Sequence, residues 1–498
     1  MIDFTSTAFQ FVFLPLVLIG FWSIQTRAPR WSVPFLVLSS VIFLGANSLF
    51  SLSVLLCCAG ITRLCSMGFD TVGRRRAVFL AAGIGANLLI LVWFKLHPIE
   101  FDPETSAMLA VGMPLGLSFY AFKQITYLVD RHQDRAPDLP LKDYALFSIF
   151  FAHLPAGPIT PYKALQPQIA ALSTLALDLS KLAAGLSLYT IGVFKYTVFA
   201  RQLGNLTAPI YDAAEAGKDL CFPEAVVGSF GFLLQLYYDF SAYSDMAIGI
   251  ALCFGLVLSP NFDSPLKASC IGDYVLRWHM SLMVFARDYV FRYVQSVLAR
   301  FLPFRSAIRR RIVAWGLATC LTFFLVMVWH DAGWLALAIS LCTAFLVVAG
   351  GLARARRSRR PSSPVQLPRI VGVAACVVIA SITIVFFRAP DLATALGFFS
   401  GFAKLGALLN GTVVAQVGEI CPVFARSPEY YFLLGVFMIA TLSVFLMPNT
   451  MRVFGILPSH PALRFKPGLV WAIMLGILVW LTWMMSGQIT RGFIYERF

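Results

Sequence analysis

The chain has 498 residues, of which 59% are hydrophobic and 13% are charged, and its mean hydropathy is +0.78. Soluble domains are about 25% charged and 45–50% apolar, so this composition excludes an ordinary soluble domain, a disordered chain and a secreted disulfide scaffold. Its 39 Lys and Arg against 24 Asp and Glu give a formal net charge of +15. The basic residues occur in short runs between apolar stretches, which is typical of cytoplasmic loops. We therefore predict an integral protein of a lipid bilayer and no nucleic-acid partner.

The apolar stretches predict an all-α polytopic membrane protein, because a spanning helix needs about 20 mostly apolar residues and only helices satisfy their own backbone in lipid here. The first stretch follows Met-Ile-Asp-Phe and no basic segment, so we expect a retained first span. The 222–257 stretch is long enough for two spans or a broken pair of helices. Candidate spans lie near 8–25, 32–47, 49–65, 77–97, 108–129, 142–160, 178–200, 222–257, 312–329, 333–352, 369–388, 430–448 and 468–486.

Three arginine runs predict the orientation. They are Arg74–Arg76, the arginines within 305–311 and those within 354–360, and the positive-inside rule places all three on the cytoplasmic side. The second and third runs flank 312–352, which is then a pair of spans with a turn near His330. At 1.5 Å per residue, a straight helix puts His330 roughly 25–30 Å from the cytoplasmic charges. His330 is therefore expected deep in the membrane or near its far face.

The remaining segments indicate a single membrane domain over 1–498, without internal repeats. Residues 272–296 mix arginines with Trp, Tyr and Phe, as an amphipathic helix at the membrane interface does. Residues 353–368 are basic and rich in Pro and Ser, which predicts a solvated cytoplasmic loop.

Two histidines stand out as candidates for chemistry. His330 ends the uncharged apolar run CLTFFLVMVWH, and an ionisable group within a membrane marks a functional site by default. A neutral imidazole accepts protons at neutral pH, as a general base must. A histidine that only hydrogen-bonds to a neighbouring helix explains the position about equally well. His279 lies beside Arg277 and Trp278, where an interfacial surface residue is the more frequent explanation.

A polar cluster within 235–246 contains Asp239, Ser241, Tyr243 and Asp245 between two apolar arms. Such groups must line a cavity or a helix junction instead of facing lipid. A structural hydrogen-bond cluster accounts for them as well as a substrate channel does. The chain has no CxxC, HExxH, P-loop or GxSxG motif, so we predict no metal site and no bound cofactor.

Taken in order, the motifs resemble the membrane-bound O-acyltransferases, in particular their bacterial alginate O-acetyltransferase branch. The resemblance runs nearly from end to end. It is carried by FTSTAFQFVFLPLVLIGFW, PLGLSFYAFKQITYLVDRH, FFAHLPAGPITPYKALQPQI, LQLYYDFSAYSDMAIGIALCFGLVLSPNFDSP, RWHMSLMVFARDYVF, VMVWHDAGW, FFRAPDLATALGFF and GFIYERF. A single one of these motifs can occur by chance, whereas the whole series in this order is specific to the family.

The resemblance implies about 11–12 transmembrane helices plus interfacial helices around a central funnel. The family's catalytic histidine matches His330, and its second histidine, in the RWH motif of 272–296, matches His279. Residues implied to line the substrate tunnel are Asp239, Ser241, Tyr243, Asp245, Trp278 and Trp329. Two positions depart from the branch's pattern: Asp331 stands where Gly is common, and Ala242 replaces a Gly. A carboxylate at 331 either favours the imidazolium of His330 or points into the turn.

The implied function is O-acetylation of an exported, alginate-like polysaccharide at the bacterial inner membrane. The implied donor is a cytoplasmic thioester such as acetyl-CoA, and a periplasmic protein partner is expected to complete the transfer. Within the family, the alternatives are D-alanyl transfer to teichoic acid and acylation of cellulose or peptidoglycan. From other classes, a transporter or flippase for an envelope precursor, or a scaffold for an export complex, also fits many spans with buried acids.

Overall fold

The fold was analysed in a computed structural model, which describes residues 3–70, 73–97, 113–154, 156–330, 333–358, 368–405 and 429–486. These residues form helices and turns, and no β-strand occurs among them. The prediction of an all-α protein is therefore confirmed. Asp331, the linker residues 359–367 and the C-terminal GFIYERF motif lie outside the described residues.

Twenty α-helices are described, in two groups separated by the loop after residue 253. The first group consists of α1 (Leu14–Arg27), α2 (Ser32–Asn47), α3 (Leu49–Met67), α4 (Arg74–Leu96), α5 (Leu117–His132), α6 (Leu141–Ile149), α7 (Tyr162–Ala170), α8 (Leu179–Phe194), α9 (Arg201–Glu215) and α10 (Phe222–Cys253). The second consists of α11 (Ile271–Arg277), α12 (Met280–Phe285), α13 (Arg292–Phe301), α14 (Ala307–His330), α15 (Trp334–Ser358), α16 (Arg369–Arg388), α17 (Leu392–Ala403), α20 (Glu429–Leu446), α21 (Thr450–Val453) and α22 (Leu469–Met485).

Eight helical segments of the described chain are long and apolar enough to cross a membrane. They match the predicted spans that begin near 8, 32, 49, 77, 178, 312, 369 and 430. The segment after Asp178 continues through a π-helical stretch, Lys195–Ala200, to Glu215. The described chain has, in addition, three shorter apolar helical stretches, Leu337–Ala353, Leu392–Ala403 and Leu469–Met485. The protein is therefore a multi-pass membrane protein.

Two predicted spans have a different form. The 142–160 span is wrong, because α6 ends at Ile149 and residues 157–161 are not helical. Gly157 and Pro158 do not continue a helix. The 222–257 stretch is one continuous helix of 32 residues, α10, and not a broken pair. Part of the 108–129 span lies outside the described residues, and its remainder belongs to the largely buried α5.

The segments expected as one interfacial helix and one loop are also divided differently. Residues 272–296 contain α11, α12, a π-helical stretch and the start of α13, and the first break falls at Trp278 and His279. An amphipathic pattern describes which side chains are apolar and which are polar along a helix. It contains no information about a local change of φ and ψ, so the sequence did not reveal this break. The basic loop 353–368 begins as the last turns of α15, which extends to Ser358.

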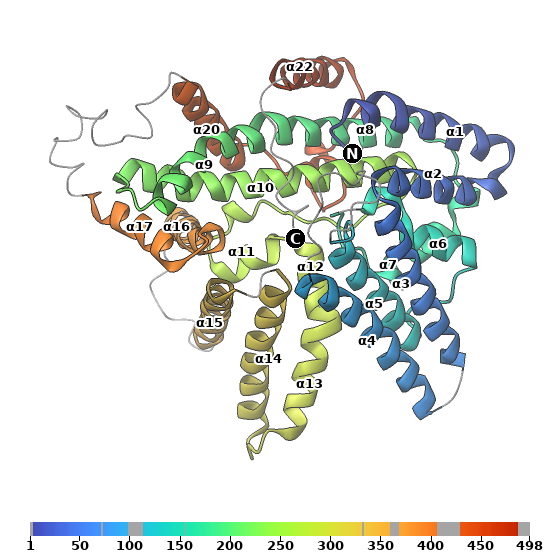
Figure 1. The fold of residues 1–498 in the computed structure, drawn as a ribbon, viewed down its shortest axis with the longest axis horizontal. Helices are drawn as coiled ribbons and strands as arrows, with labels where there is room; N and C mark the ends of the chain where they lie inside the picture. The colour runs from blue at the N-terminus through green and yellow to red at the C-terminus, as the bar shows by residue number, and fades with distance from the viewer. Residues whose placement is uncertain are drawn as a thin grey trace.

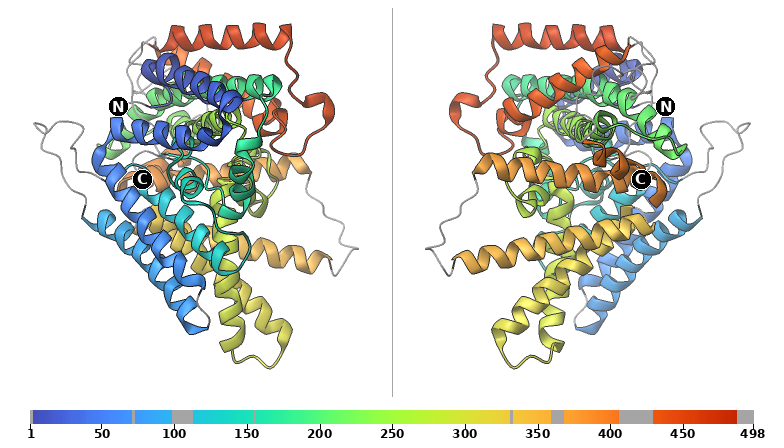
Figure 2. Two further views of the ribbon diagram at one scale, coloured as in Figure 1. Left: turned by 90° about the vertical axis from the view of Figure 1, so that its right-hand side faces the viewer. Right: turned by 90° about the vertical axis from the view of Figure 1, so that its left-hand side faces the viewer.

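The helices form a central layer with two arms. Figures 1 and 2 show α8, α9 and α10 running side by side through the centre, with α1 and α2 beside them, whereas the pairs α3–α4 and α13–α14 project from this layer. Close packing of α8 on α10 requires glycine: a Cβ on Gly185 would lie 2.7 Å from the Gly249 carbonyl oxygen, and a Cβ on Gly249 would lie 2.6 Å from that of Gly185. Small residues allow such backbone approach between membrane helices.

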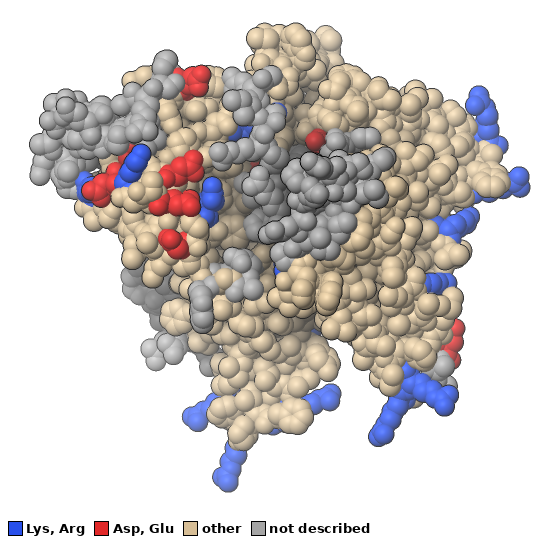
Figure 3. Space-filling view, viewed as in Figure 1, with Lys and Arg blue, Asp and Glu red and all other residues tan. Residues whose placement is uncertain are grey.

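Charge is distributed unevenly over the surface. Figure 3 shows Lys and Arg along the right and lower edges of the molecule, where the α3–α4 and α13–α14 connections lie, and acidic residues gathered at the upper left. The exposed acids at the end of α9 and just after it are Asp212, Glu215 and Asp219. The first two arginine runs thus share one side of the molecule, as the positive-inside rule predicts.

Candidate functional site

His279 occupies a sharp turn between α11 and α12. Its φ of 47° and ψ of 50° lie in the left-handed region, which non-glycine residues enter rarely and only when their surroundings hold them there. The Met280 amide donates to the Asn261 carbonyl at 2.8 Å, and the Ser281 hydroxyl donates to the Asn261 side-chain oxygen at 2.5 Å. The segment around Asn261, which packs beside the turn, therefore fixes its conformation.

Asn261 connects this turn to the centre of the molecule. Its side-chain amide donates to Ser244 of α10 at 2.9 Å, and the Ser281 hydroxyl also accepts from the Ile159 amide at 3.0 Å. Asn261, Ser244 and Ser281 are all buried, and fully satisfied buried polar networks specify one local geometry. The sequence analysis missed Asn261, because it lies in the polar, proline-containing segment SPNFDS, where an Asn does not stand out.

His330 is the last residue of α14 and lies near His279. The two ring centroids are 6.5 Å apart, with an angle of 59° between the ring planes. Aromatic side chains surround the pair: Phe240 of α10 stands edge-on to His279 at 4.6 Å, and Phe387 of α16 lies 6.3 Å from His330. Two histidines 51 positions apart in sequence, each predicted from its own motif, are thus brought together.

Both histidines line one cavity of about 180 Å³. Most of its wall is apolar, and hydroxyl groups from Tyr274, Ser340, Thr343 and Thr383 complete it. Trp278 also lines this cavity. The apolar members of the wall are Leu236, Val275, Leu282, Met283, Phe323, Val326, Met327, Ile339, Ile384 and Phe387. A cavity with few polar groups and two imidazoles is suited to a reaction that moves a proton in low-dielectric surroundings.

The electrostatics of His279 favour its neutral form. The residue lies outside the eight candidate spans and is 3% exposed. Burial lowers the pKa of His279 well below its usual value, and the neighbouring His330 lowers this pKa further. A neutral imidazole offers one nitrogen as a hydrogen-bond donor and the other as an acceptor, so His279 can hold a substrate oxygen or relay a proton.

Trp329 is not part of the cavity wall. It is buried against Phe119 and Phe122 of α5, with ring centroids 5.5 and 5.0 Å away, respectively. The carbonyl of Trp329 accepts a hydrogen bond from the ammonium group of Lys95, near the end of α4. Lys95 was missed in the sequence analysis, although a lone charge at the end of an apolar run marks such a contact. Trp329 and Lys95 therefore anchor the end of α14 that carries His330.

The predicted polar residues of α10 make their own contacts within the helix packing. The Lys195 ammonium lies 2.7 Å from an Asp245 carboxylate oxygen, and the Thr450 hydroxyl donates to the other oxygen at 3.1 Å. Ser241 and Asp245 line a second cavity of only about 10 Å³. The Tyr243 hydroxyl accepts from the Ala156 amide at 3.2 Å. These contacts match the structural hydrogen-bond cluster that the sequence left open.

None of Asp239, Ser241, Tyr243 and Asp245 is among the residues that line the histidine cavity. Asp239 is buried on α10, directly before Phe240, whose ring contacts His279. Of the predicted site residues, the structure groups His330, His279 and Trp278 in the cavity wall, and the others are not among its lining residues. The departure at Ala242 leaves the helix intact, since Ala242 is fully buried within α10.

Comparison with known proteins identifies the family. The model of the membrane-bound O-acyltransferase family matches residues 85–388, which include both histidines and the cavity wall. The chain belongs to the membrane-bound O-acyltransferase family and is therefore an acyltransferase enzyme.

Individual relatives differ in the acyl acceptor that their names state. The chain is 28% identical over 440 residues to a peptidoglycan O-acetyltransferase of Helicobacter pylori, which covers 81% of this chain and 80% of that protein. It is 30% identical over 356 residues to a probable alginate O-acetylase AlgI of Azotobacter vinelandii, covering 66% and 65%, respectively. A teichoic acid D-alanyltransferase of Bacillus subtilis is 26% identical over 263 residues, covering 51% and 62%. The match thus spans less than two thirds of the last two relatives.

Proposed function

We propose that this enzyme transfers an acetyl group from a cytoplasmic thioester, such as acetyl-CoA, to hydroxyl groups of an exported, alginate-like polysaccharide at the bacterial inner membrane. The observation that carries the proposal is the pair His330 and His279, which line one cavity with ring centroids 6.5 Å apart. Family membership supplies the reaction type, and the alginate O-acetylase relatives support the acceptor.

In this proposal, His330 is the general base. Its imidazole accepts the proton of an attacking hydroxyl, directly or through one water molecule. The hydroxyl oxygen then forms a bond to the thioester carbonyl carbon as the carbon–sulfur bond breaks, and the imidazolium returns its proton to the leaving thiolate. His279, held in its turn by Asn261, donates a hydrogen bond toward the carbonyl oxygen, where negative charge develops.

The size of the cavity supports a short acyl chain. Its volume of about 180 Å³ is below the roughly 300–1,000 Å³ that is usual for pockets enclosing whole small-molecule ligands. An acetyl thioester fits such a space better than a long-chain acyl group does. Ser340 and Thr383 belong to this wall, and their hydroxyls donate to the carbonyl oxygens of Leu337 and Ile379 on their own helices.

The charge distribution supports transfer across the membrane. Along α14, His330 is 20 residues beyond Arg310, a separation of about 30 Å at 1.5 Å per residue. A thioester that carries phosphates is attracted to the basic side, whereas the acetyl group would leave on the opposite side. We therefore expect a periplasmic protein partner that passes the acetyl group to the polymer.

Peptidoglycan is the second candidate acceptor. The specific observation in its favour is the extent of the match to the Helicobacter pylori peptidoglycan O-acetyltransferase, which covers 81% of this chain. Both acceptors are glycans that present hydroxyls outside the inner membrane, and the same base and the same donor would serve either.

The deciding experiment compares a deletion strain with the same strain complemented by the wild-type gene. Ester-bound acetate is measured separately in exopolysaccharide and in peptidoglycan, and ester-linked D-alanine is measured in the envelope. We expect the exopolysaccharide esters to disappear on deletion and to return on complementation. If only the acetate esters of peptidoglycan disappear, peptidoglycan is the acceptor. If only ester-linked D-alanine disappears, the reaction is D-alanyl transfer. Loss of polymer export with normal acetylation would favour a flippase.

The contribution of His279 is tested by replacing it with asparagine, which also tolerates the left-handed conformation. His279→Asn keeps the turn and removes the imidazole, so we expect about 10²-fold slower acyl transfer with little change in thermal stability. The measurement is the initial rate of acetyl-ester formation with purified protein in lipid. The matched control is His460→Asn, at an exposed histidine. Full activity in His279→Asn would reduce His279 to a packing residue.

A further inference from the structure

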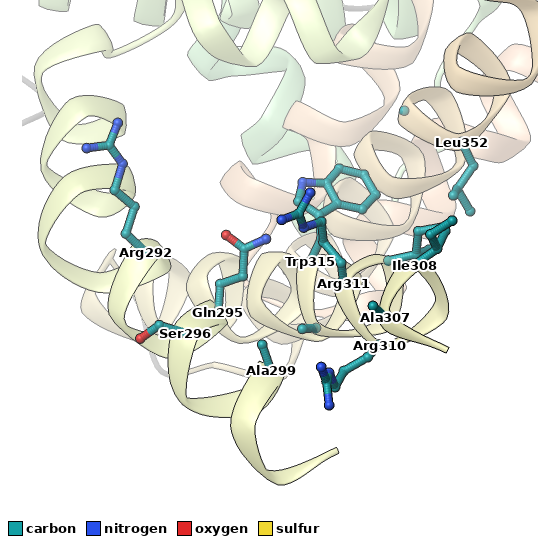
Figure 4. A pocket seen from close by; sticks show the side chains of 13 residues that line it. Arg292, Gln295, Ser296, Ala299, Ala307, Ile308, Arg310, Arg311, Trp315 and Leu352 are labelled. Carbon is teal, nitrogen blue, oxygen red and sulfur yellow. The ribbon is translucent and has the colours of Figure 1, made fainter. Parts of the chain in front are cut away.

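A groove separate from the histidine cavity lies between α13, α14 and α15, at the basic side of the molecule. Its volume is about 920 Å³. Figure 4 shows Gln295 of α13 and Arg311 of α14 near Trp315 at its centre, with Arg310 at one end. The residues that line it are Arg292, Gln295, Ser296, Ala299, Ala307, Ile308, Arg310, Arg311, Ile312, Ala314, Trp315, Gly351 and Leu352.

The groove carries an uncompensated positive charge. Within the described part of the chain, no carboxylate lies within 4.0 Å of the guanidinium groups of Arg310 or Arg311. Arg292 is shared with Asp288, at 3.5 Å. Gln295 adds an amide donor on the facing helix, whereas the Ser296 hydroxyl donates to the Tyr293 carbonyl of its own helix at 2.7 Å. The two free arginines therefore favour an anionic group, and guanidinium groups bind phosphate oxygens in a bidentate manner.

The groove is amphipathic and lies at the first turns of α14. The candidate span of α14 begins at Ala307, so we expect Arg310 and Arg311 at the level of the lipid headgroups. Beyond them the wall becomes apolar with Ile312, Ala314 and Leu352. Trp315 stands at the boundary, as tryptophans at membrane interfaces do.

Gly351 of α15 allows Trp315 to lie where it does. A Cβ at Gly351 would come within 2.6 Å of the Trp315 ring. Any side chain at 351 would force the indole into a different position, so a glycine here keeps the indole against α15. The groove is therefore shaped by three helices and is not a chance gap beside a single one.

We propose that this groove binds the headgroup of an anionic phospholipid of the cytoplasmic leaflet, with the phosphate on Arg310 and Arg311 and an acyl chain along Ile312 and Leu352. Basic pockets between membrane helices on the cytoplasmic side bind such headgroups. A free phosphate would use the arginines alone and gain nothing from the apolar wall. The bound lipid joins α13, which follows the His279 turn, to α14, which ends at His330.

The test measures phospholipid binding to the delipidated full-length protein by native mass spectrometry. Phosphatidylglycerol is titrated in parallel with phosphatidylcholine and with inorganic phosphate. Arg310→Gln combined with Arg311→Gln removes two favourable charges and should weaken phosphatidylglycerol binding roughly 30-fold. The matched control is Arg305→Gln combined with Arg309→Gln, which removes equal charge from the same segment but outside the groove. The control should bind phosphatidylglycerol as the wild type does.

Gln295→Glu is a second variant that leaves all the arginines in place. It puts a carboxylate beside Arg311 and should also weaken phosphatidylglycerol binding, which keeps the test decisive if the double arginine variant fails to fold. Equal weakening in the Arg305 and Arg309 control, unchanged binding in both groove variants, or inorganic phosphate binding as tightly as phosphatidylglycerol would overturn the proposal. No acyl donor is present, so these outcomes are independent of the enzymatic function proposed above.

Discussion

Replacing His330 with alanine should lower acyl transfer by about 10²–10⁴-fold, the range that a positioned general base contributes, while the protein remains folded. His330 ends α14 and lines the cavity. The end of α14 is held by the Trp329 carbonyl, which is hydrogen-bonded to Lys95, and by the Trp329 ring, which packs on α5. The loss should therefore appear in kcat and not in the yield of membrane-inserted protein.

The measurement is acetyl-ester formation by equal amounts of purified wild-type and His330→Ala protein, alongside ester content in the complemented deletion strain. His460→Ala serves as the control, because His460 is exposed and distant in sequence from the site. An active, well-expressed His330→Ala protein would show that His330 is structural and that another residue acts as the base. If the His330→Ala protein is inactive and elutes as an aggregate, the test is repeated with His330→Gln, which keeps more of the side-chain volume.

The sequence was sufficient for features that depend on local pattern. Runs of about 20 apolar residues predicted the membrane helices, and the isolated His330 at the end of such a run marked the cavity. Gly157 and Pro158 do not continue a helix, yet the residues before them were apolar enough to suggest a span. Apolar content measures compatibility with lipid and is insensitive to backbone geometry, so the 142–160 prediction failed.

Features that depend on distant partners could not be predicted. The sequence shows that Asp245 must be satisfied within the protein, but the partners are Lys195, 50 residues earlier, and Thr450, 205 residues later. Similarly, the left-handed turn at His279 is held by Asn261, which no motif connects to it. A polar residue that is expected to be buried must have a hydrogen-bond partner, but the sequence does not indicate which helix supplies that partner.

The charge balance around Asp245 leads to the second large effect. Lys195 is only 14% exposed and Asp245 only 3% exposed at the side chain, and breaking a buried ion pair by removing one partner costs about 3–5 kcal/mol. Asp245→Asn should therefore destabilise the protein strongly, because the Lys195 ammonium is left without its carboxylate. The measurement is the thermal unfolding midpoint of detergent-purified protein, followed by size-exclusion chromatography.

The double variant Asp245→Asn with Lys195→Met separates stability from catalysis. It removes both charges together, and replacing a whole buried ion pair with uncharged groups of similar volume is often close to neutral. If the pair only joins α10 to the α8–α9 segment and to Thr450, the double variant should recover most of the lost stability and also the acyl-transfer rate. A variant that is stable but inactive would indicate that Asp245 takes part in the reaction, as a residue of the substrate tunnel that the family resemblance implies. We expect recovery of both, because Asp245 lines the small second cavity and is not among the residues that line the histidine cavity.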